Sequence, residues 1–399
     1  MSQSPNRLAS LDVLRGIAIL GILVINVRAF AEVSTAQLNP GVMGSFEGPD
    51  FWIWFVSHLL FEYSFMPLLA ALFGAGLVIQ GDRLSARGLQ AGRVIRRRMA
   101  ALAMIGLGHL VFIWYGDILL LYAVVGVIAA RFRHLPPPRL LGWALLFYLV
   151  PFAFALFMTA ALNWLPADEY ETVRQQFWSA GSSQVQQELE AYRGSWMTQL
   201  QHRLTVLVES WPAMLITESG WRVLALMLVG MALYRAGFFS GTWPESPYRR
   251  LALLGFGMGL PLCQWGVLYN MTHEWRMAEA LYAGRQFNLW AGPLVALGWA
   301  SLMMLALRRG LMKGVLERVR ALGKVALSAY LLCSLLGTAF FYTGGRFEAT
   351  PRLVQLQFVL AVWLVLLVIA PLWLRYWRTG PAEWLWRRFA YQHPPDEPL

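Results

Sequence analysis

His109 and Asp117 are the two side chains whose types and spacing best suit acid–base chemistry. They lie in the stretch GLGHLVFIWYGDILLLYAVVG, residues 106–126, where two apolar helical segments meet at a predicted tight turn. An unpaired charge at the bilayer centre costs roughly 2.5 to 3.5 kcal/mol, so ionisable residues in such segments face a partner or a cavity. A histidine beside a carboxylate serves as a general base or proton relay. Two alternatives remain: Asp117 as an ordinary helix N-cap, and His109 as a hydrogen-bonded core residue.

His58 and Glu62 form a second pair of this kind, four residues apart and therefore on one face of a helix. Like His109 and Asp117, this pair could serve as a general base or proton relay. Alternatively, the two side chains satisfy each other's hydrogen bonds in a packed bundle. Neither histidine belongs to an HxH or HExxH pattern, so we expect no metal.

Asp12 and Arg15 share a face near the start of the first apolar segment. They form either an interfacial salt bridge that anchors this helix or part of a pocket for an anionic cofactor. The run Arg96, Arg97 and Arg98 would extend such a pocket, because guanidinium groups bind phosphate oxygens bidentately.

The elements that position these residues are apolar helices. Hydrophobic residues make up 58% of the 399 positions and charged residues only 14%, which excludes an ordinary soluble globule. Spans of about 20 residues cross the hydrocarbon layer, and we count about ten. The predicted spans are residues 11–30, 51–80, 99–114, 117–133, 140–162, 218–236, 251–270, 288–307, 322–342 and 354–374.

The net charge of +11 comes from arginines and lysines that cluster in alternate loops. The positive-inside rule therefore places both termini in the cytoplasm, predicts an even number of spans and argues against nucleic acid as a partner. The two cysteines, Cys263 and Cys333, lie in predicted spans and are too few for a disulfide framework. We therefore predict an all-α polytopic membrane protein.

The chain, residues 1–399, is predicted to form a single membrane domain. Residues 1–162 hold the first five helices, residues 163–210 form a polar helical segment on the outer side, and residues 211–399 hold the last five helices and the tail. Gly255 and Gly259 lie four residues apart within one span, which predicts close packing against another helix.

Four stretches resemble the YeiB-like bacterial inner-membrane proteins, the family of domain of unknown function 418. The resemblance implies a multi-pass protein of the bacterial inner (cytoplasmic) membrane. The first-helix pattern LDVLRG is also similar to a wider superfamily of transmembrane acyltransferases. The stretches are RLASLDVLRGIAILGILVIN at 7–26, LLAALFGAGLVIQGDR at 68–83, GHLVFIWYGDILL at 108–120 and GPAEWLWR at 380–387.

That wider resemblance implies that an acyl-CoA donor binds from the cytoplasm and that its acyl group reaches an acceptor at the outer face. His109 or His58 would then act as general base or transient acyl carrier, oriented by Asp117 or Glu62. Asp12, Arg15 and the run Arg96, Arg97 and Arg98 would hold the donor, and Asn26, Trp114 and Tyr115 would contact substrate. The related enzymes carry a histidine soon after the first helix, and this chain has none between residues 26 and 51.

Two other functions fit the same sequence. Five spans on each side of the outer segment would suit a secondary transporter built from inverted repeats. A non-catalytic scaffold in the cell envelope would instead use residues 163–210 as its key surface. The lipid bilayer is the certain partner in every case, and the sequence leaves a homo-oligomer open.

Overall fold

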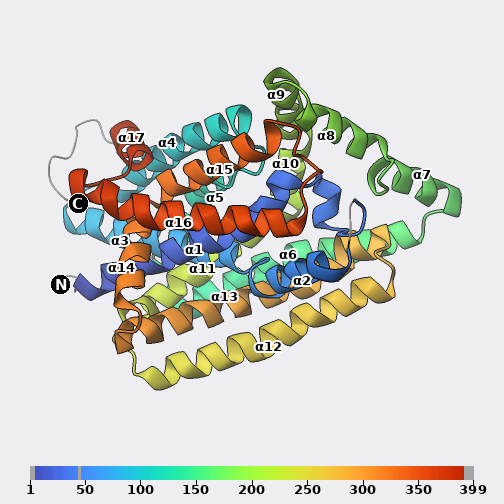
Figure 1. The fold of residues 1–399 in the computed structure, drawn as a ribbon. Helices are drawn as coiled ribbons and strands as arrows, with labels where there is room; N and C mark the ends of the chain where they lie inside the picture. Colours follow the sequence, from blue (N-terminus) through green and yellow to red (C-terminus); the bar gives the residue numbers. More distant parts are fainter. Residues whose placement is uncertain (1–4, 44–45, 391–399) are drawn as a thin grey trace.

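The computed structural model describes residues 5–43 and 46–390, and within these residues the chain forms helices and no strand (Figure 1). The predicted all-α class is confirmed. The elements, with η for short 3-10 or π turns, are α1 (Pro5–Ala31), η1 (Ser34–Gln37), α2 (Gly48–Leu60), α3 (Phe65–Ala86), α4 (Ala91–Phe112), α5 (Leu119–Ala129), η2 (Ala130–Phe132), α6 (Pro137–Asn163), α7 (Ala167–Phe177), α8 (Ser183–Arg193), α9 (Trp196–Thr205), η3 (Val206–Ser210), α10 (Trp211–Met214), η4 (Leu215–Ser219), α11 (Gly220–Arg235), η5 (Phe238–Ser240), α12 (Glu245–Thr272), η6 (Glu279–Ala283), α13 (Gly284–Arg309), α14 (Lys313–Lys324), α15 (Ala326–Tyr342), α16 (Arg352–Tyr376) and α17 (Pro381–Ala390).

In the described part of the chain, seven helical runs are long and apolar enough to cross a membrane. The number becomes eight if α14 and α15, which meet at an angle of 88°, form one broken span. These helices make the chain a multi-pass membrane protein, as predicted. The seven runs are Ala9–Ala31, Gly48–Ala86, Pro137–Asn163, Trp196–Arg235, Glu245–Thr272, Glu279–Arg309 and Arg352–Tyr376.

The helix α1 runs through the centre of the bundle, and α6, α12 and α16 lie at its periphery (Figure 1). The apolar window of α1 is 78% buried inside the protein, whereas that of α6 is only 17% buried. An apolar helix with so little burial requires lipid around it. The short helices α7 and α8 project at one end of the bundle, opposite the end where α1 begins (Figure 1).

The second and sixth predicted spans differ from the helices observed. The span expected at residues 51–80 is divided into α2 and α3 by a break at residues 61–64, where Tyr63 has φ 56°. The span expected at residues 218–236 belongs to a longer helical run that begins at Trp196 and includes the π turns η3 and η4. The polar segment predicted at residues 163–210 therefore comprises α7, α8 and the start of this run.

Glycines set several of the close helix contacts. A Cβ atom on Gly255 would lie 2.5 Å from the Leu294 carbonyl oxygen, and one on Gly259 would lie 2.6 Å from a Val295 methyl group. The predicted close packing at these two glycines is therefore confirmed, with α13 as the neighbour. At the end of the bundle where α1 begins, α14 crosses α1, and there a Cβ atom on Gly323 would lie 1.7 Å from the Asp12 carbonyl oxygen.

Candidate functional site

His109 and Asp117 meet as the sequence predicts. The Nδ1 atom of His109 lies 2.7 Å from Asp117 Oδ2, and the other carboxylate oxygen, Oδ1, accepts a 2.7 Å hydrogen bond from the Leu120 backbone N–H. Asp117 therefore both caps the first turn of α5 and orients the histidine. The Nε2 atom of His109 is buried and has no hydrogen-bond partner among the described residues. An imidazole that binds a carboxylate through one nitrogen and has no hydrogen-bond partner at the other has the arrangement of a general base.

A glycine one turn earlier allows this contact. A Cβ atom on Gly106 would lie 2.4 Å from the Leu120 backbone nitrogen and 3.0 Å from Asp117 Oδ1. The bare backbone of α4 can therefore approach the start of α5 closely enough for His109 to reach Asp117.

His58 is held differently, because both of its ring nitrogens have partners. Its Nδ1 atom lies 2.6 Å from Glu62 Oε2, and its Nε2 atom lies 2.8 Å from the amide nitrogen of Asn288. Since an amide nitrogen only donates, Nε2 is the acceptor and Nδ1 carries the proton. The Trp54 ring stacks on the imidazole at 4.6 Å.

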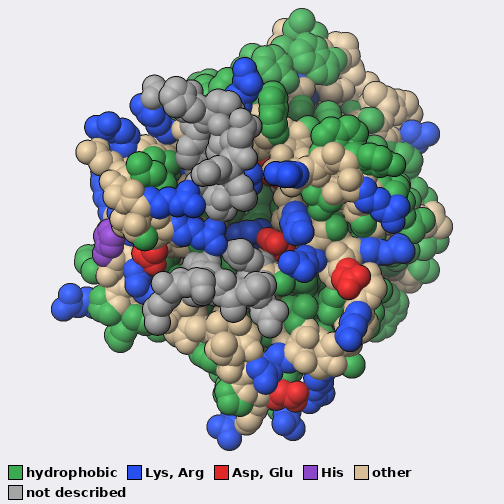
Figure 2. Space-filling view, turned by 90° about the vertical axis from the view of Figure 1, so that its left-hand side faces the viewer, with side chains coloured by type: hydrophobic (Ala, Val, Ile, Leu, Met, Phe, Trp, Pro, Cys, Tyr) green, Lys and Arg blue, Asp and Glu red, His purple; other side chains and the backbone are tan. Residues whose placement is uncertain are grey.

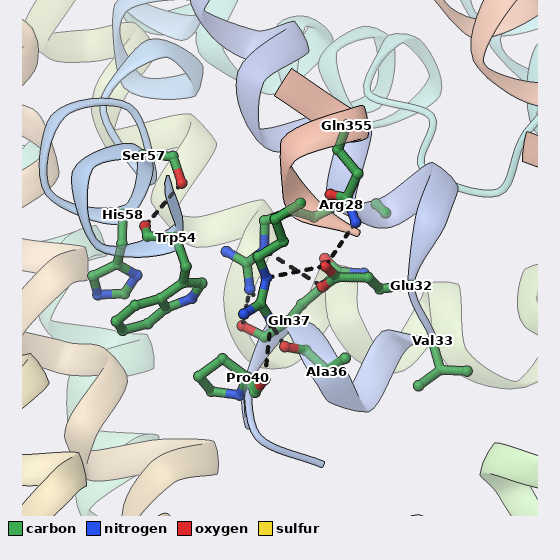
Figure 3. A network of polar contacts seen from close by, with 12 residues as sticks. Arg28, Glu32, Val33, Ala36, Gln37, Pro40, Trp54, Ser57, His58 and Gln355 are labelled. Atoms are coloured by element: carbon green, nitrogen blue, oxygen red, sulfur yellow. Dashed lines mark hydrogen bonds and ion pairs between the residues drawn. The ribbon is translucent and has the colours of Figure 1, made fainter. Parts of the chain in front are cut away.

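Glu62 also belongs to a buried network at the C-terminal end of α1. Figure 3 shows the part of this network around Arg28, Glu32 and Gln355. Arg28 Nη1 donates to Glu62 Oε2 over 3.0 Å, and Arg28 also lies 3.7 Å from Glu32. Arg352 Nε donates to Glu32 over 3.3 Å. Two arginines thus face two carboxylates, so the network is balanced in charge and joins α1, α2 and α16.

A cavity of about 420 Å³ opens at the end of the bundle where α3, α4, α14 and α17 come together. Basic side chains gather around a hollow on this face (Figure 2). Those that line the cavity are Arg15, Arg83, Arg87, Arg98, Lys324 and Arg387.

The inner part of the cavity is apolar and leads toward His109. Its walls carry side chains such as Leu72, Phe73 and Leu102, and it reaches Ile118 and Tyr330. The Tyr330 ring centroid lies 5.2 Å from that of His109, and the Tyr330 hydroxyl accepts a 3.3 Å hydrogen bond from the Ile118 backbone N–H. His109 and Asp117 do not line the cavity themselves; Tyr330 and Ile118 lie between.

The residues predicted to hold an anionic donor divide into three groups. Arg15 and Arg98 line the cavity, and Asp12 forms the predicted ion pair with Arg15 at 3.1 Å. Arg96 lines a separate cavity of about 110 Å³ with Arg131 and Arg133. Arg97 lies exposed on the surface of α4.

Helix α17 completes the cavity in a way that our sequence reasoning missed. Glu383 accepts hydrogen bonds from the backbone N–H groups of Leu327 and Ser328 at the start of α15. Trp386 donates to the Arg98 carbonyl oxygen over 2.8 Å, and the Arg98 guanidinium lies 4.2 Å from the Trp386 ring centroid. The motif GPAEWLWR could have indicated this helix, whereas no sequence motif pointed to Tyr330.

The residues predicted to contact substrate lie near the C-terminal ends of α1 and α4. Asn26 is half-buried in α1. The Trp114 ring packs 4.2 Å from Phe30, and the Tyr115 hydroxyl donates to the Ala29 carbonyl oxygen over 3.3 Å. The described residues contain no group of three or more histidine, cysteine, aspartate or glutamate side chains placed to bind a metal.

Two carboxyl groups outside the spans hold the loop after α1. Glu188 on α8 accepts hydrogen bonds from the Ser34 backbone N–H and hydroxyl, and Glu348 accepts one from the Val33 backbone N–H over 2.6 Å. Burial raises the pKa of each carboxyl group to about 7, although these hydrogen bonds oppose the shift.

Comparison with known proteins shows that the chain is similar to proteins of unknown function. The model of the family "Protein of unknown function (DUF418)" matches residues 233–393. The chain is 32% identical over 394 residues to "Uncharacterized protein YeiB" of Escherichia coli (strain K12), which covers 96% of each chain. It is 26% identical over 402 residues to "Uncharacterized protein YxaH" of Bacillus subtilis (strain 168), covering 96% of this chain and 94% of the relative. No solved structure matches the chain.

Proposed function

Since the chain belongs to the YeiB-like DUF418 family, whose function is unknown, we propose that it is a membrane-bound acyltransferase. It takes an acyl group from an acyl-CoA donor on the cytoplasmic side and passes it to an acceptor at the outer face. One observation carries this proposal: a cavity with a basic mouth and an apolar interior that ends beside the ring packed against His109. An anionic nucleotide joined to an apolar chain has the matching distribution of charge.

The orientation that we propose for the protein in the membrane places the basic cavity where a cytoplasmic donor can enter it. We take α4, α5 and the bent pair α14–α15 as further crossings beside the seven apolar runs, which makes ten. The basic face with the cavity then lies in the cytoplasm, with both termini, and α7 and α8 lie outside (Figures 1 and 2). The membrane is the bacterial inner membrane, as in the family resemblance.

In the proposed reaction His109 is the general base. The acceptor hydroxyl or amine attacks the thioester carbonyl carbon, and His109 Nε2 takes its proton. The carbon–sulfur bond breaks, and the imidazolium returns the proton to the departing CoA thiolate. Asp117 holds the Nδ1–H and stabilises the imidazolium. His58 is less suited to this role because Asn288 occupies its second nitrogen.

Binding of a CoA thioester to the purified full-length protein tests the proposal. A ligand present at a hundred times its Kd adds about 2.7 kcal/mol of apparent stability, which a thermal melt detects. We expect acetyl-CoA to raise Tm for the wild type and much less for Arg98→Gln, which removes a charge from the cavity. Arg250→Gln is the matched control, because Arg250 is exposed and does not line the cavity. If acetyl-CoA left the Tm of the wild type unchanged, the proposal would be overturned.

A secondary transporter is the second candidate, and the break between α2 and α3 favours it. The break exposes no lipid-facing charge, because Glu62 within it is buried and bonded to His58 and Arg28. Broken helices in transporters carry substrate sites of this kind near the midplane. Uptake of a small solute by proteoliposomes, without any CoA response in the melt, would select this function over acyl transfer.

A further inference from the structure

A second polar cluster lies among α11, α13 and the break between α2 and α3, and the proposed acyl transfer does not use it. Its centre is the Glu218 carboxylate. Arg222 Nη1 donates to Glu218 Oε1 over 3.0 Å, and Arg285 binds both carboxylate oxygens at 3.0 and 3.1 Å. Arg285 Nε also donates to the Tyr63 hydroxyl over 3.3 Å. The Arg222 guanidinium lies 5.5 Å from the Tyr63 ring centroid.

Three irregular stretches of backbone place these four side chains. Glu218 lies in the π turn η4, and Arg285 follows the π turn η6 by two residues. Tyr63 has φ 56°, a conformation that is unfavourable for a bulky side chain. Such features are uncommon and gather at functional sites. Their convergence on one cluster distinguishes it from an ordinary ion pair between straight helices.

The charges of the cluster do not balance. Two guanidinium groups face one carboxylate, which leaves one positive charge within the membrane-spanning runs. The neighbouring carboxylate of Glu62 is shared, because it pairs directly with Arg28 and His58. The Nε atom of Arg222 is buried without a hydrogen-bond partner among the described residues. An uncompensated charge within a membrane-spanning run is costly, so a bound anion would stabilise the site.

From the unbalanced charge and the converging backbone we propose that Arg222 and Arg285 bind the phosphate group of a ligand. The ligand must share the guanidinium groups with Glu218, which favours a group with more charge and more acceptor oxygens than a carboxylate. Phosphate is such a group, and arginine pairs bind it bidentately. The side chains of Arg285 and Glu218 remain 22% and 23% exposed, so the cluster is not sealed inside the protein. It belongs either to a phospholipid headgroup or to a soluble phosphate ester.

Thermal melts of the full-length protein with two probes test this site. Inorganic phosphate in detergent reports a soluble ligand, and nanodiscs with and without phosphatidylglycerol report a lipid headgroup. We expect one of the probes to raise Tm in the wild type. Glu218→Gln removes the competing carboxylate and should bind that probe about tenfold more tightly, the scale of one charge-assisted hydrogen bond. Arg285→Gln should lose the response.

Arg276→Gln is the matched control, because Arg276 is 56% exposed, lies 3.8 Å from Glu279 and donates a 3.5 Å hydrogen bond to Asn163, outside the cluster. It should respond as the wild type does. A wild type that neither probe stabilises, or a Glu218→Gln variant that binds no more tightly, would overturn the proposal. If Arg285→Gln fails to fold, the comparison between the wild type and Glu218→Gln decides. Acetyl-CoA binding is measured separately, so failure here leaves the acyltransferase proposal standing.

Discussion

At the scale of single residues, the two histidines differ in what their second ring nitrogen contacts. Asn288 binds that nitrogen of His58, whereas that of His109 has no partner among the described residues. The sequence predicted both histidine–carboxylate contacts, because helical spacing brings His58 near Glu62 and a short turn brings His109 near Asp117. It could not predict Asn288, which lies 230 residues from His58 and approaches it only through tertiary packing.

The first prediction concerns His109. Replacing it with glutamine removes the proposed base, so acetyl-CoA hydrolysis with water as acceptor should fall by about 10² to 10⁴-fold. Release of free thiol measures the rate, and the acetyl-CoA melt should show unchanged binding. His134→Gln, at an exposed position on the basic face, serves as the control and should keep the wild-type rate. Equal rates in both variants would exclude His109 as the base.

The second prediction concerns pH. Because the pKa values of Glu188 and Glu348 are raised to about 7 from an ordinary 4.5, the folded protein binds more protons than the unfolded chain between these values. Stability from these groups is therefore greatest below about pH 4.5 and is lost as pH rises through about 7. We expect Tm to fall between pH 5.5 and pH 8.

Glu188→Gln should weaken this dependence, because glutamine resembles the protonated acid at every pH. The exposed Glu190→Gln on the same helix is the control and should leave the slope unchanged. A slope equally steep in both variants would show that other groups cause the pH effect.

At the scale of helices, bare glycine backbone decides which elements meet. The close packing at Gly255 and Gly259 could be predicted from the sequence, because the two glycines share one face of a helix. The structure identifies α13 as the neighbouring helix. The crossing of α14 over α1 was not, since residues 322–342 read as one straight apolar span. The 88° bend leaves α14 across the basic end of the bundle, where Gly323 lies against Asp12.

The third prediction tests this crossing. In Gly323→Ala the new Cβ atom would overlap the Asp12 carbonyl oxygen, so α14 must move away from α1. We expect a loss of about 1 to 3 kcal/mol in stability, the scale of overpacking, together with weaker acetyl-CoA binding. Thermal melts with and without acetyl-CoA measure both effects.

Gly314→Ala is the matched control on the same helix. A Cβ atom there meets nothing within 4 Å, so alanine should be tolerated or slightly stabilising. If Gly323→Ala were tolerated equally well, the close approach of the two helices would not be needed for the fold.

At the scale of the whole molecule, the sequence predicted the helical class and the membrane setting, and it offered a pocket at Arg15 and Arg98 as one alternative, but it did not predict the other walls of the cavity. Composition and hydropathy suffice for the first two. The cavity depends on residues from α3, α4, α14, α15 and α17 that no local pattern joins, and Arg83 and Arg387 resemble other loop arginines in the sequence.

The fourth prediction tests the proposed orientation. An impermeant maleimide should label Ala180→Cys, exposed beyond α7, in intact cells. It should label Ser85→Cys, exposed near the end of α3, only after the cells are opened. The native Cys263 and Cys333 are buried and should not react. The reverse pattern of labelling would invert the topology and place the cavity outside.

The position of α17 has a consequence for biosynthesis. This helix follows every membrane-spanning helix in the chain, yet Trp386 and Arg387 form part of the cavity wall, and Glu383 caps α15. While the ribosome is still translating, the earlier helices can enter the bilayer with one side of the cavity missing. The wall closes only after translation has passed residue 387. We therefore expect a chain that ends before residue 383 to lack this wall and to bind the proposed donor more weakly than the full chain.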